Sequence, residues 1–372
     1  MTSVTTSRFR ARAVDHLAVA IGTTKGLFFV SDSTVDGPLL AGNAVSAFAQ
    51  LPSGRLLAAT TDPRFGPPNV RVSDDGGLTW DEPGARPVAF PAETETALAS
   101  VWQLHVDRRP NATETVWAGV EPGGLFRSDD GADTFELVRG LFEHPDRPTW
   151  EPGACGLALH TVITHPERPE RIVVAISSAG VYRSDDGGDT WVARNQGIEA
   201  RLLSEPLPGA GQCVHKLAVD AVNPDVLWAQ NHGGIYRSVD AGDHWESVGH
   251  AGEPDGVASD FGFPIVSHPE EPDTAYVLPL ESDVYPCTAE GRCRVYRTAN
   301  GGLSWDALSD GLPRTHAHLT VLRDAFSIGN NQPYPLVFGS ESGHAFASVD
   351  DGESWRLVAS YLPPVLWVRV LE

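Results

Sequence analysis

A short turn-forming motif recurs six times along this chain, and its spacing constrains the fold more than any other feature. The copies begin at Ser73, Ser128, Ser184, Ser238, Thr298 and Ser348. Most of them read Ser or Thr, any residue, Asp or Asn, any residue, Gly, any residue, Thr or Ser, and Trp. Successive copies start 50 to 60 residues apart. A fixed period of this length indicates a repeat fold such as a propeller or a solenoid.

The chemistry of the motif is that of a tight turn. The side chain of the third residue, Asp or Asn, can accept hydrogen bonds from backbone N–H groups of the turn. Gly at the fifth position permits a positive φ angle, and the closing aromatic residue covers the hairpin. Two copies depart from the pattern, because Ala132 replaces the usual Gly and His244 the usual Thr. The motif resembles the Asp-box, or BNR repeat, of sialidases and glycosyl-hydrolase-like propellers of the wider WD40/YVTN-like type.

The residues around each motif predict a four-stranded blade. An aromatic strand such as 180–183 precedes the motif, a small-residue strand such as 172–175 precedes that one, and a further strand comes earlier. Segments 17–22 and 26–32 read as two strands of another blade, and 365–371 as its missing inner strand. We therefore predict an all-β, seven-bladed β-propeller of four-stranded antiparallel blades over residues 15–372, closed by the C-terminal strand. A flexible segment is expected at 1–14.

Charge and composition limit the partners. The chain of 372 residues has 49 acidic and 27 basic residues, and a net charge of −22. Such a surface repels polyanions, so we expect neither nucleic acid nor a membrane as partner. No stretch reads as a signal peptide or a membrane span, which favours a cytoplasmic protein. The four cysteines do not indicate a disulfide framework; Cys287 and Cys293 could pair if oxidised, while Cys155 and Cys213 are expected to stay thiols.

Three histidines mark the expected site. In a propeller, the turns between second and third strands and the connections between blades meet on one face near the axis. Counted back from the motifs, His160 and His215 take equivalent places on the inner strands of adjacent blades. His232 lies in the turn that follows the second strand of the latter blade. Repeat geometry therefore predicts that the three side chains converge.

Three roles are open for these histidines. They could hold one divalent transition metal ion, with Gln230 or Glu281 as an oxygen ligand. One of them could instead act as a general base that a carboxylate orients. In the third reading, each one hydrogen-bonds a neighbouring strand. A pair of carboxylates would suit glycoside cleavage, and the acidic candidates at this face are Glu121, Asp260, Glu281, Asp283 and Glu341.

The resemblance to sialidases does not extend to their site motifs. The chain has no Arg-Ile-Pro or Arg-Leu-Pro sequence, and its regularly placed arginines look like blade-packing or surface residues. These are Arg127, Arg183, Arg237 and Arg297. The chain more closely resembles cytoplasmic bacterial propellers with BNR repeats; xyloglucanases and photosystem assembly factors also use such repeats.

The expected function is that of a metal-assisted or His-based hydrolase or lyase acting on a small polar or carbohydrate-like ligand. The alternative is a non-catalytic scaffold for a protein partner, with the loop at 279–294 as a contact surface.

Overall fold

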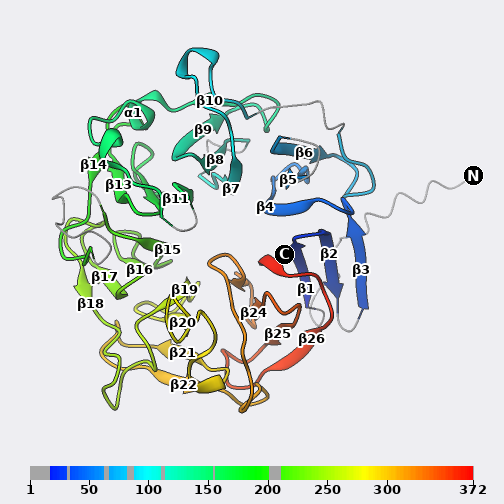
Figure 1. Cartoon of the computed structure of the whole chain (residues 1–372), viewed down its shortest axis with the longest axis vertical. Coiled ribbons are helices and arrows are strands. Elements are labelled where there is room, and N and C mark those ends of the chain that lie inside the picture. The colour runs from blue at the N-terminus through cyan, green and yellow to red at the C-terminus, as the bar shows by residue number, and fades with distance from the viewer. Residues whose placement is uncertain are drawn as a thin grey trace, which may run out of the picture.

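The fold is a ring of antiparallel sheets. The computed structural model describes residues 17–31, 34–62, 67–81, 88–109, 114–153, 156–200 and 211–371. Seven sheets stand around a common centre (Figure 1), six with four strands and one with three within the described residues. The predicted seven-bladed β-propeller is therefore confirmed. The segment 1–14, expected to be flexible, lies outside the described residues.

The strands follow the order that the repeat predicts. From the inside outward, the first blade contains β27 (Val365–Val370), β1 (Ala18–Thr23), β2 (Gly26–Ser31) and β3 (Thr34–Leu39). The second contains β4 (Ala44–Gln50), β5 (Leu56–Thr61) and β6 (Asn69–Ser73). The third contains β7 (Ser100–Val106), β8 (Val116–Glu121), β9 (Gly124–Ser128) and β10 (Glu136–Leu137). The fourth contains β11 (Leu159–Thr164), β12 (Ile172–Ile176), β13 (Gly180–Ser184) and β14 (Val192–Ala193).

The remaining three blades repeat this arrangement. The fifth contains β15 (Val214–Val219), β16 (Leu227–Asn231), β17 (Gly234–Ser238) and β18 (Glu246–Ser247). The sixth contains β19 (Gly262–Ser267), β20 (Ala275–Pro279), β21 (Val295–Thr298) and β22 (Asp306–Leu308). The seventh contains β23 (Phe326–Ile328), β24 (Leu336–Gly339), β25 (Ala345–Ser348) and β26 (Arg356–Ala359). The α-helix α1 (Arg139–Phe142) is a single turn, and the described chain has no helix that is long and apolar enough to cross a membrane.

The C-terminal strand closes the ring. β27 pairs antiparallel with β1, with Val368 opposite Ile21, and the red end of the chain lies beside blue β1 in Figure 1. Trp367 extends the closure to the second blade, because its Nε1 donates to the Val45 carbonyl oxygen at 2.8 Å and its ring stacks on Phe48. This confirms that the two ends of the sequence share one blade.

The six repeated turns have one hydrogen-bonding pattern. In every copy, the carboxylate or amide oxygen of the third residue accepts a bond from the backbone N–H of the seventh, at 2.9 to 3.1 Å. In the fourth blade, Gly188 N–H also donates to Ser184 Oγ at 2.8 Å. Hydrogen bonds from Thr190, the first of its causes, lower the pKa of Asp186 to about 2. Ala132 takes the positive φ of the Gly that it replaces, at 71°.

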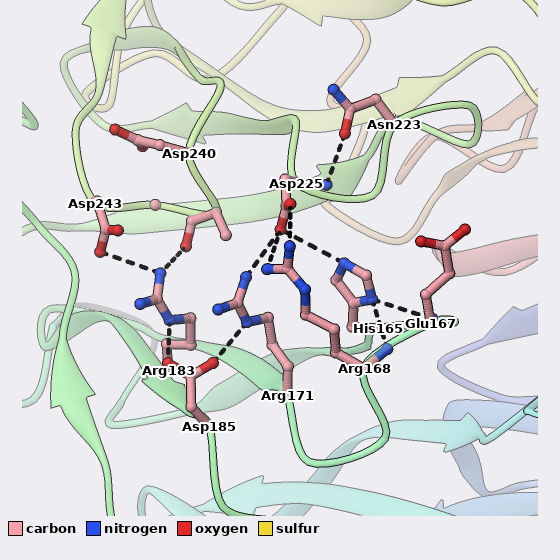
Figure 2. Close-up of polar contacts among 12 residues, drawn as sticks. His165, Glu167, Arg168, Arg171, Arg183, Asp185, Asn223, Asp225, Asp240 and Asp243 are labelled. Carbon is pink, nitrogen blue, oxygen red and sulfur yellow. Dashed lines mark hydrogen bonds and ion pairs between the residues drawn. The ribbon is translucent and has the colours of Figure 1, made fainter.

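Arginines on the third strands tie adjacent blades together. Arg183, on β13, is only 6% exposed and donates to the Ala241 carbonyl oxygen in the fifth blade at 2.9 Å. Its guanidinium also pairs with Asp185 and Asp243, at 2.9 and 3.1 Å (Figure 2). A buried charge is tolerated when it is paired and hydrogen-bonded in this way. The expectation that Arg183 serves blade packing is met.

Candidate functional site

The inner strands carry a β-bulge at equivalent positions. The pairing of inner and second strands shifts between residues 45 and 47, 101 and 103, 159 and 161, and 214 and 216. The extra residues are Ser46, Trp102, His160 and His215. A bulge re-aims one side chain out of the regular alternation. The repeat spacing thus correctly placed His160 and His215 at matching points of adjacent blades.

Bulge side chains bond the next blade. Three of them contact a carbonyl oxygen that directly precedes the bulge position of the following blade. These contacts join Ser46 Oγ to Val101, His160 Nε2 to Val214, and His215 Nδ1 to Gly262, at 2.7, 2.9 and 2.6 Å. One function of the bulge histidines is therefore to connect neighbouring inner strands.

His160 is fully engaged in this structural role. The side chain is completely buried, and its second nitrogen, Nδ1, lies 3.0 Å from Thr161 Oγ1. Burial, followed by the charges of Arg323 and Lys216, lowers the pKa of His160 well below its ordinary value, so the ring is neutral. With both nitrogens bonded, His160 does not join the other two histidines, and the reading in which it bonds a neighbouring strand describes it.

His215 and His232 do come together, and Cys213 joins them. One donor atom from each residue lies within 4.8 Å of the others, and Cys213 Sγ is 3.6 Å from His215 Nε2. We call Cys213, His215 and His232 the donor cluster. Cys213 precedes β15, and His232 lies in the turn between β16 and β17, at the opposite end of β17 from the repeated turn. We call this side of the ring the site face.

The tautomer of His215 follows from its contacts. Nδ1 contacts the Gly262 carbonyl oxygen, which can only accept, so Nδ1 carries the proton and Nε2 presents a lone pair toward Cys213. Burial, and then the charge of Arg323, lower the pKa of His215 to about 3. A neutral imidazole with one unprotonated ring nitrogen is the form that binds a metal ion.

A carboxylate and two aromatic rings surround the donor cluster. His232 Nε2 lies 3.5 Å from Oδ2 of Asp283, which is on the β20–β21 connection. The ring of Phe261 is 5.3 Å from that of His232, and the ring of Phe263 is 4.9 Å from that of His215. The cluster is thus bordered by one carboxylate and two aromatic rings.

The remaining candidates take up other positions. Gln230 Nε2 donates to the carbonyl oxygens of Asp260, Asn231 and Gly234, so its amide group braces the turn that carries His232. These three bonds engage the amide nitrogen of Gln230 with backbone carbonyl groups and not with the donor cluster.

Of the acidic candidates, Glu121 and Glu281 also have identifiable partners. Glu121 Oε2 accepts from Trp102 Nε1 at 3.1 Å in the third blade. Glu281 Oε2 accepts from the backbone N–H of Glu290 at 3.0 Å. Of the six predicted catalytic residues, the described structure brings His215 and His232 into the donor cluster.

The four cysteines differ in their surroundings and in what the structure describes of them. Sequence reasoning assigned Cys213 only as a thiol and missed its contact with His215, although Cys213 and His215 are two residues apart in the sequence. Cys287 and Cys293 form no disulfide in the structure, and burial raises the pKa of Cys293 to about 12. Cys155 lies outside the described residues.

A surface hollow lies at the opposite face of the ring. It is lined by residues of the repeated turns of the second and third blades, among them Asp75, Trp80 and Ala132. Arg55 crosses it to pair with Asp74 and Asp133, each at 2.7 Å. These contacts join two blades, which gives the hollow a structural explanation.

Comparisons with known proteins agree on the architecture. No family model matches the chain. An oligoxyloglucan-reducing end-specific xyloglucanase from Emericella nidulans is 26% identical over 147 residues, which is 38% of this chain and 16% of that protein. Among solved structures, the GH74 xyloglucanase from Xanthomonas campestris has a TM-score of 0.60 at 16% identity and covers 92% of this chain. YCF48 bound to a D1 peptide has a TM-score of 0.52 at 13% identity and covers 93%.

The share of each relative that is matched differs. The chain covers 52% of the Xanthomonas xyloglucanase and 86% of YCF48. It thus spans about half the length of the former and a small part of the fungal enzyme. At these identities the likeness shows the fold: this chain is a seven-bladed β-propeller that resembles GH74 xyloglucanases in its architecture.

Proposed function

We propose that the chain is a metal-assisted hydrolase or lyase that acts on a small polar or carbohydrate-like ligand at the donor cluster. The observation that carries this proposal is the convergence of one sulfur and two imidazole donors on the site face. Thiolate and imidazole are the ligands that zinc and related transition metals prefer. The bound ion would polarise a substrate oxygen or lower the pKa of a bound water molecule.

The spacing of the donors supports a metal site. A sulfur about 2.3 Å and a nitrogen about 2.05 Å from one tetrahedral ion lie ~3.6 Å apart. The distance between Cys213 Sγ and His215 Nε2 is 3.6 Å. The three donor atoms lie within 4.8 Å of one another, so His232 would have to move somewhat closer to the other two residues to bind the same ion. His232 is the residue that lies in a turn. Three protein ligands leave a fourth position for water or substrate, as in catalytic zinc sites.

The surroundings of the cluster support a catalytic role. The proximity of Asp283 to His232 Nε2 allows the carboxylate to fix the orientation and tautomer of the ring. The same pair also fits the metal-free version of the proposal, in which His232 is a general base oriented by Asp283. Phe261 and Phe263 offer flat apolar surfaces for the substrate or for excluding water.

The fold neighbours support the substrate class. The name xyloglucanase denotes an enzyme that acts on a carbohydrate, and one xyloglucanase shares this architecture over 92% of the chain. The hydrogen-bonding pattern of the repeated turns supports assigning them to the Asp-box type, which occurs in many carbohydrate-active propellers. Both points favour a carbohydrate-like ligand over other polar molecules.

Elemental analysis tests the metal centre. The purified protein should contain about one transition metal ion per chain after reconstitution, and Cys213→Ser and His232→Ala should lose it. His244→Ala is the matched control, because His244 is an exposed histidine in a repeated turn on the opposite face. His215→Ala is a poorer variant, since it also removes the bond to Gly262. A reconstituted protein without metal would refute the metal centre and leave His232 with Asp283 as an acid–base pair.

A specific observation also supports the scaffold alternative. YCF48, which is described with a bound D1 peptide, matches this chain over 86% of its own length. On the β20–β21 connection, next to Asp283, Val284 is 89% and Tyr285 is 49% exposed. If this loop docks a protein, Val284→Asp with Tyr285→Asp should abolish binding to a purified partner while the metal content stays unchanged.

A further inference from the structure

Arg323 is a buried cation without an anionic partner. The residue is 8% exposed, and its Nε is buried without a hydrogen-bond acceptor. Within the described residues, it forms no ion pair or hydrogen bond through its side chain, and its guanidinium lies over the ring of Trp102, 4.9 Å from the centroid. Arg183, at a similar 6% exposure, has two carboxylates and a carbonyl oxygen (Figure 2). A nearly buried guanidinium whose Nε has no acceptor is unusual, and such groups occur preferentially at functional sites.

The position of Arg323 places it at the centre of the ring. It directly precedes Asp324, whose backbone forms an isolated parallel β-bridge with Trp367 on β27. Its guanidinium lies over the ring of Trp102 on β7 in the third blade. Asp324 pairs with Lys216 on β15, the residue that follows His215. Arg323 and His215 are therefore each next in the sequence to one partner of the same ion pair, which places Arg323 near the donor cluster.

Other cations gather in the same region. Lys216, on β15, pairs with Asp324, so that one carboxylate of the seventh blade neutralises a cation of the fifth. Asp324 also interacts electrostatically with Arg369, an exposed residue of β27. Asp324 is thus shared between two other cations. Glu121, the second carboxylate nearby, accepts the indole N–H of Trp102.

The charge balance of this region is opposite to that of the protein. Within the described residues, Lys216 pairs with Asp324, whereas Arg323, next to Asp324 in the sequence, pairs with no carboxylate, in a chain whose net charge is −22. A local excess of positive charge inside an acidic surface selects anionic ligands and concentrates them. The planar guanidinium can bind a carboxylate or phosphate group through two parallel N–H donors.

We propose that Arg323, supported by Trp102 and Lys216, binds the oxyanion group, carboxylate or phosphate, of a small-molecule ligand at the centre of the ring. This inference deepens the proposed function, since it rests on the donor cluster being the reacting site and makes the substrate of that site anionic. The oxyanion on Arg323 holds the ligand, while the donor cluster contacts its reacting part. A sugar acid and a sugar phosphate both meet this requirement.

Calorimetric titration of the full chain with inorganic phosphate, glucuronate and, as the neutral counterpart, glucose tests the proposal. Phosphate, glucuronate or both should bind, and glucose should bind more weakly. Arg323→Met keeps the apolar stem and removes the charge, and it should weaken anion binding by roughly 10- to 100-fold, as expected for charge-assisted hydrogen bonds. Arg323→Lys keeps the charge without the fork and should show an intermediate loss.

The matched control is Arg127→Met. Arg127 also stacks on an indole, 5.2 Å from the Trp117 ring centroid, but it is 43% exposed and paired with Asp129. Its loss should leave anion binding unchanged. Unaltered binding in Arg323→Met, or no anion binding by the wild-type chain, would overturn the proposal.

Metal-free protein separates this proposal from the proposed function. Anion binding that persists in chelator-treated protein and is lost in Arg323→Met supports the anion site even if no metal centre exists. Binding that requires the metal and survives Arg323→Met places the anion on the ion and overturns the assignment to Arg323. If only phosphate or only glucuronate binds, the result identifies which oxyanion the ligand carries.

Discussion

Replacing His160 with alanine should destabilise the ring without affecting the donor cluster. The substitution removes a completely buried side chain and the contact with the Val214 carbonyl oxygen that joins the fourth and fifth blades. Large-to-small changes at such sites cost about 2–5 kcal/mol, and a buried acceptor that loses its partner accounts for about 1–3 kcal/mol of this. We expect a loss of about 3 kcal/mol in the free energy of unfolding.

The corresponding thermal shift is small because the chain is long. At about 2 cal/mol/K per residue, 372 residues give an unfolding entropy of ~0.8 kcal/mol/K, if the ring unfolds as one unit. A loss of about 3 kcal/mol therefore lowers Tm by about 4 °C. Urea unfolding followed by circular dichroism gives the free energy, and calorimetry gives Tm.

The comparison with other variants makes the result specific. His244→Ala should change the free energy by less than about 0.5 kcal/mol, as surface substitutions do, and His160→Gln should recover part of the loss because its amide can still donate. Metal content should be equal in all three variants. A His160→Ala protein as stable as the wild type, or one that has lost its metal, would refute the structural role given to His160.

Two further predictions concern pH and ring closure. Burial lowers the pKa of His105 to about 4 from its ordinary value near 6.5, so the unfolded chain takes up that proton first. The contribution of neutral His105 to the free energy of unfolding should therefore be fully present above about pH 6.5. It should decline as the pH falls toward 4, by at most ~1.4 kcal/mol per pH unit for this proton. Urea midpoints across this range should show a weaker decline in His105→Gln; equal slopes would contradict the assignment. Trp367→Ala should lower the free energy of unfolding by about 3–5 kcal/mol. Gly22→Ala should also destabilise the protein, because a Cβ at position 22 would lie 2.0 Å from Trp367 Nε1. Unfolding midpoints equal to that of the wild type would contradict the role of Trp367 in closing the ring.

The fold could be predicted from the sequence because the turns that define its blades are formed by residues close together in the sequence. Each repeated turn contains its own hydrogen-bond donors and acceptors, so six copies of one motif mark six blades. The closing strand was predictable for a different reason: residues 17–31 contain strands but no inner partner, and 365–371 is a strand without a blade.

The site was accessible only in part, because spacing gives position along a strand and not the direction of a side chain. Counting from the motifs placed His160 and His215 at equivalent points, but the bulge turns both toward the next blade. His215 differs from His160 in what surrounds its second nitrogen, Cys213 Sγ in place of a hydroxyl. Strand alternation could not indicate Cys213, because Cys213 precedes β15 and the bulge at His215 interrupts the alternation.

Arg323 was beyond the reach of pattern reasoning for another reason. Neither its neighbours in the sequence nor a repeated motif distinguishes it from a surface arginine. Its burial and its missing partner become visible only when the third and seventh blades are brought together.

The pairing of β27 with β1 has a consequence for how long the native state lasts. A blade cannot leave a closed ring until one junction opens, and this junction pairs Ile21 with Val368, near opposite ends of the described chain. Contacts that break early in unfolding control its rate, whereas the equilibrium reflects all seven blades. Resistance to proteases and to slow inactivation should therefore depend on six residues of β27 far more than on any outer strand.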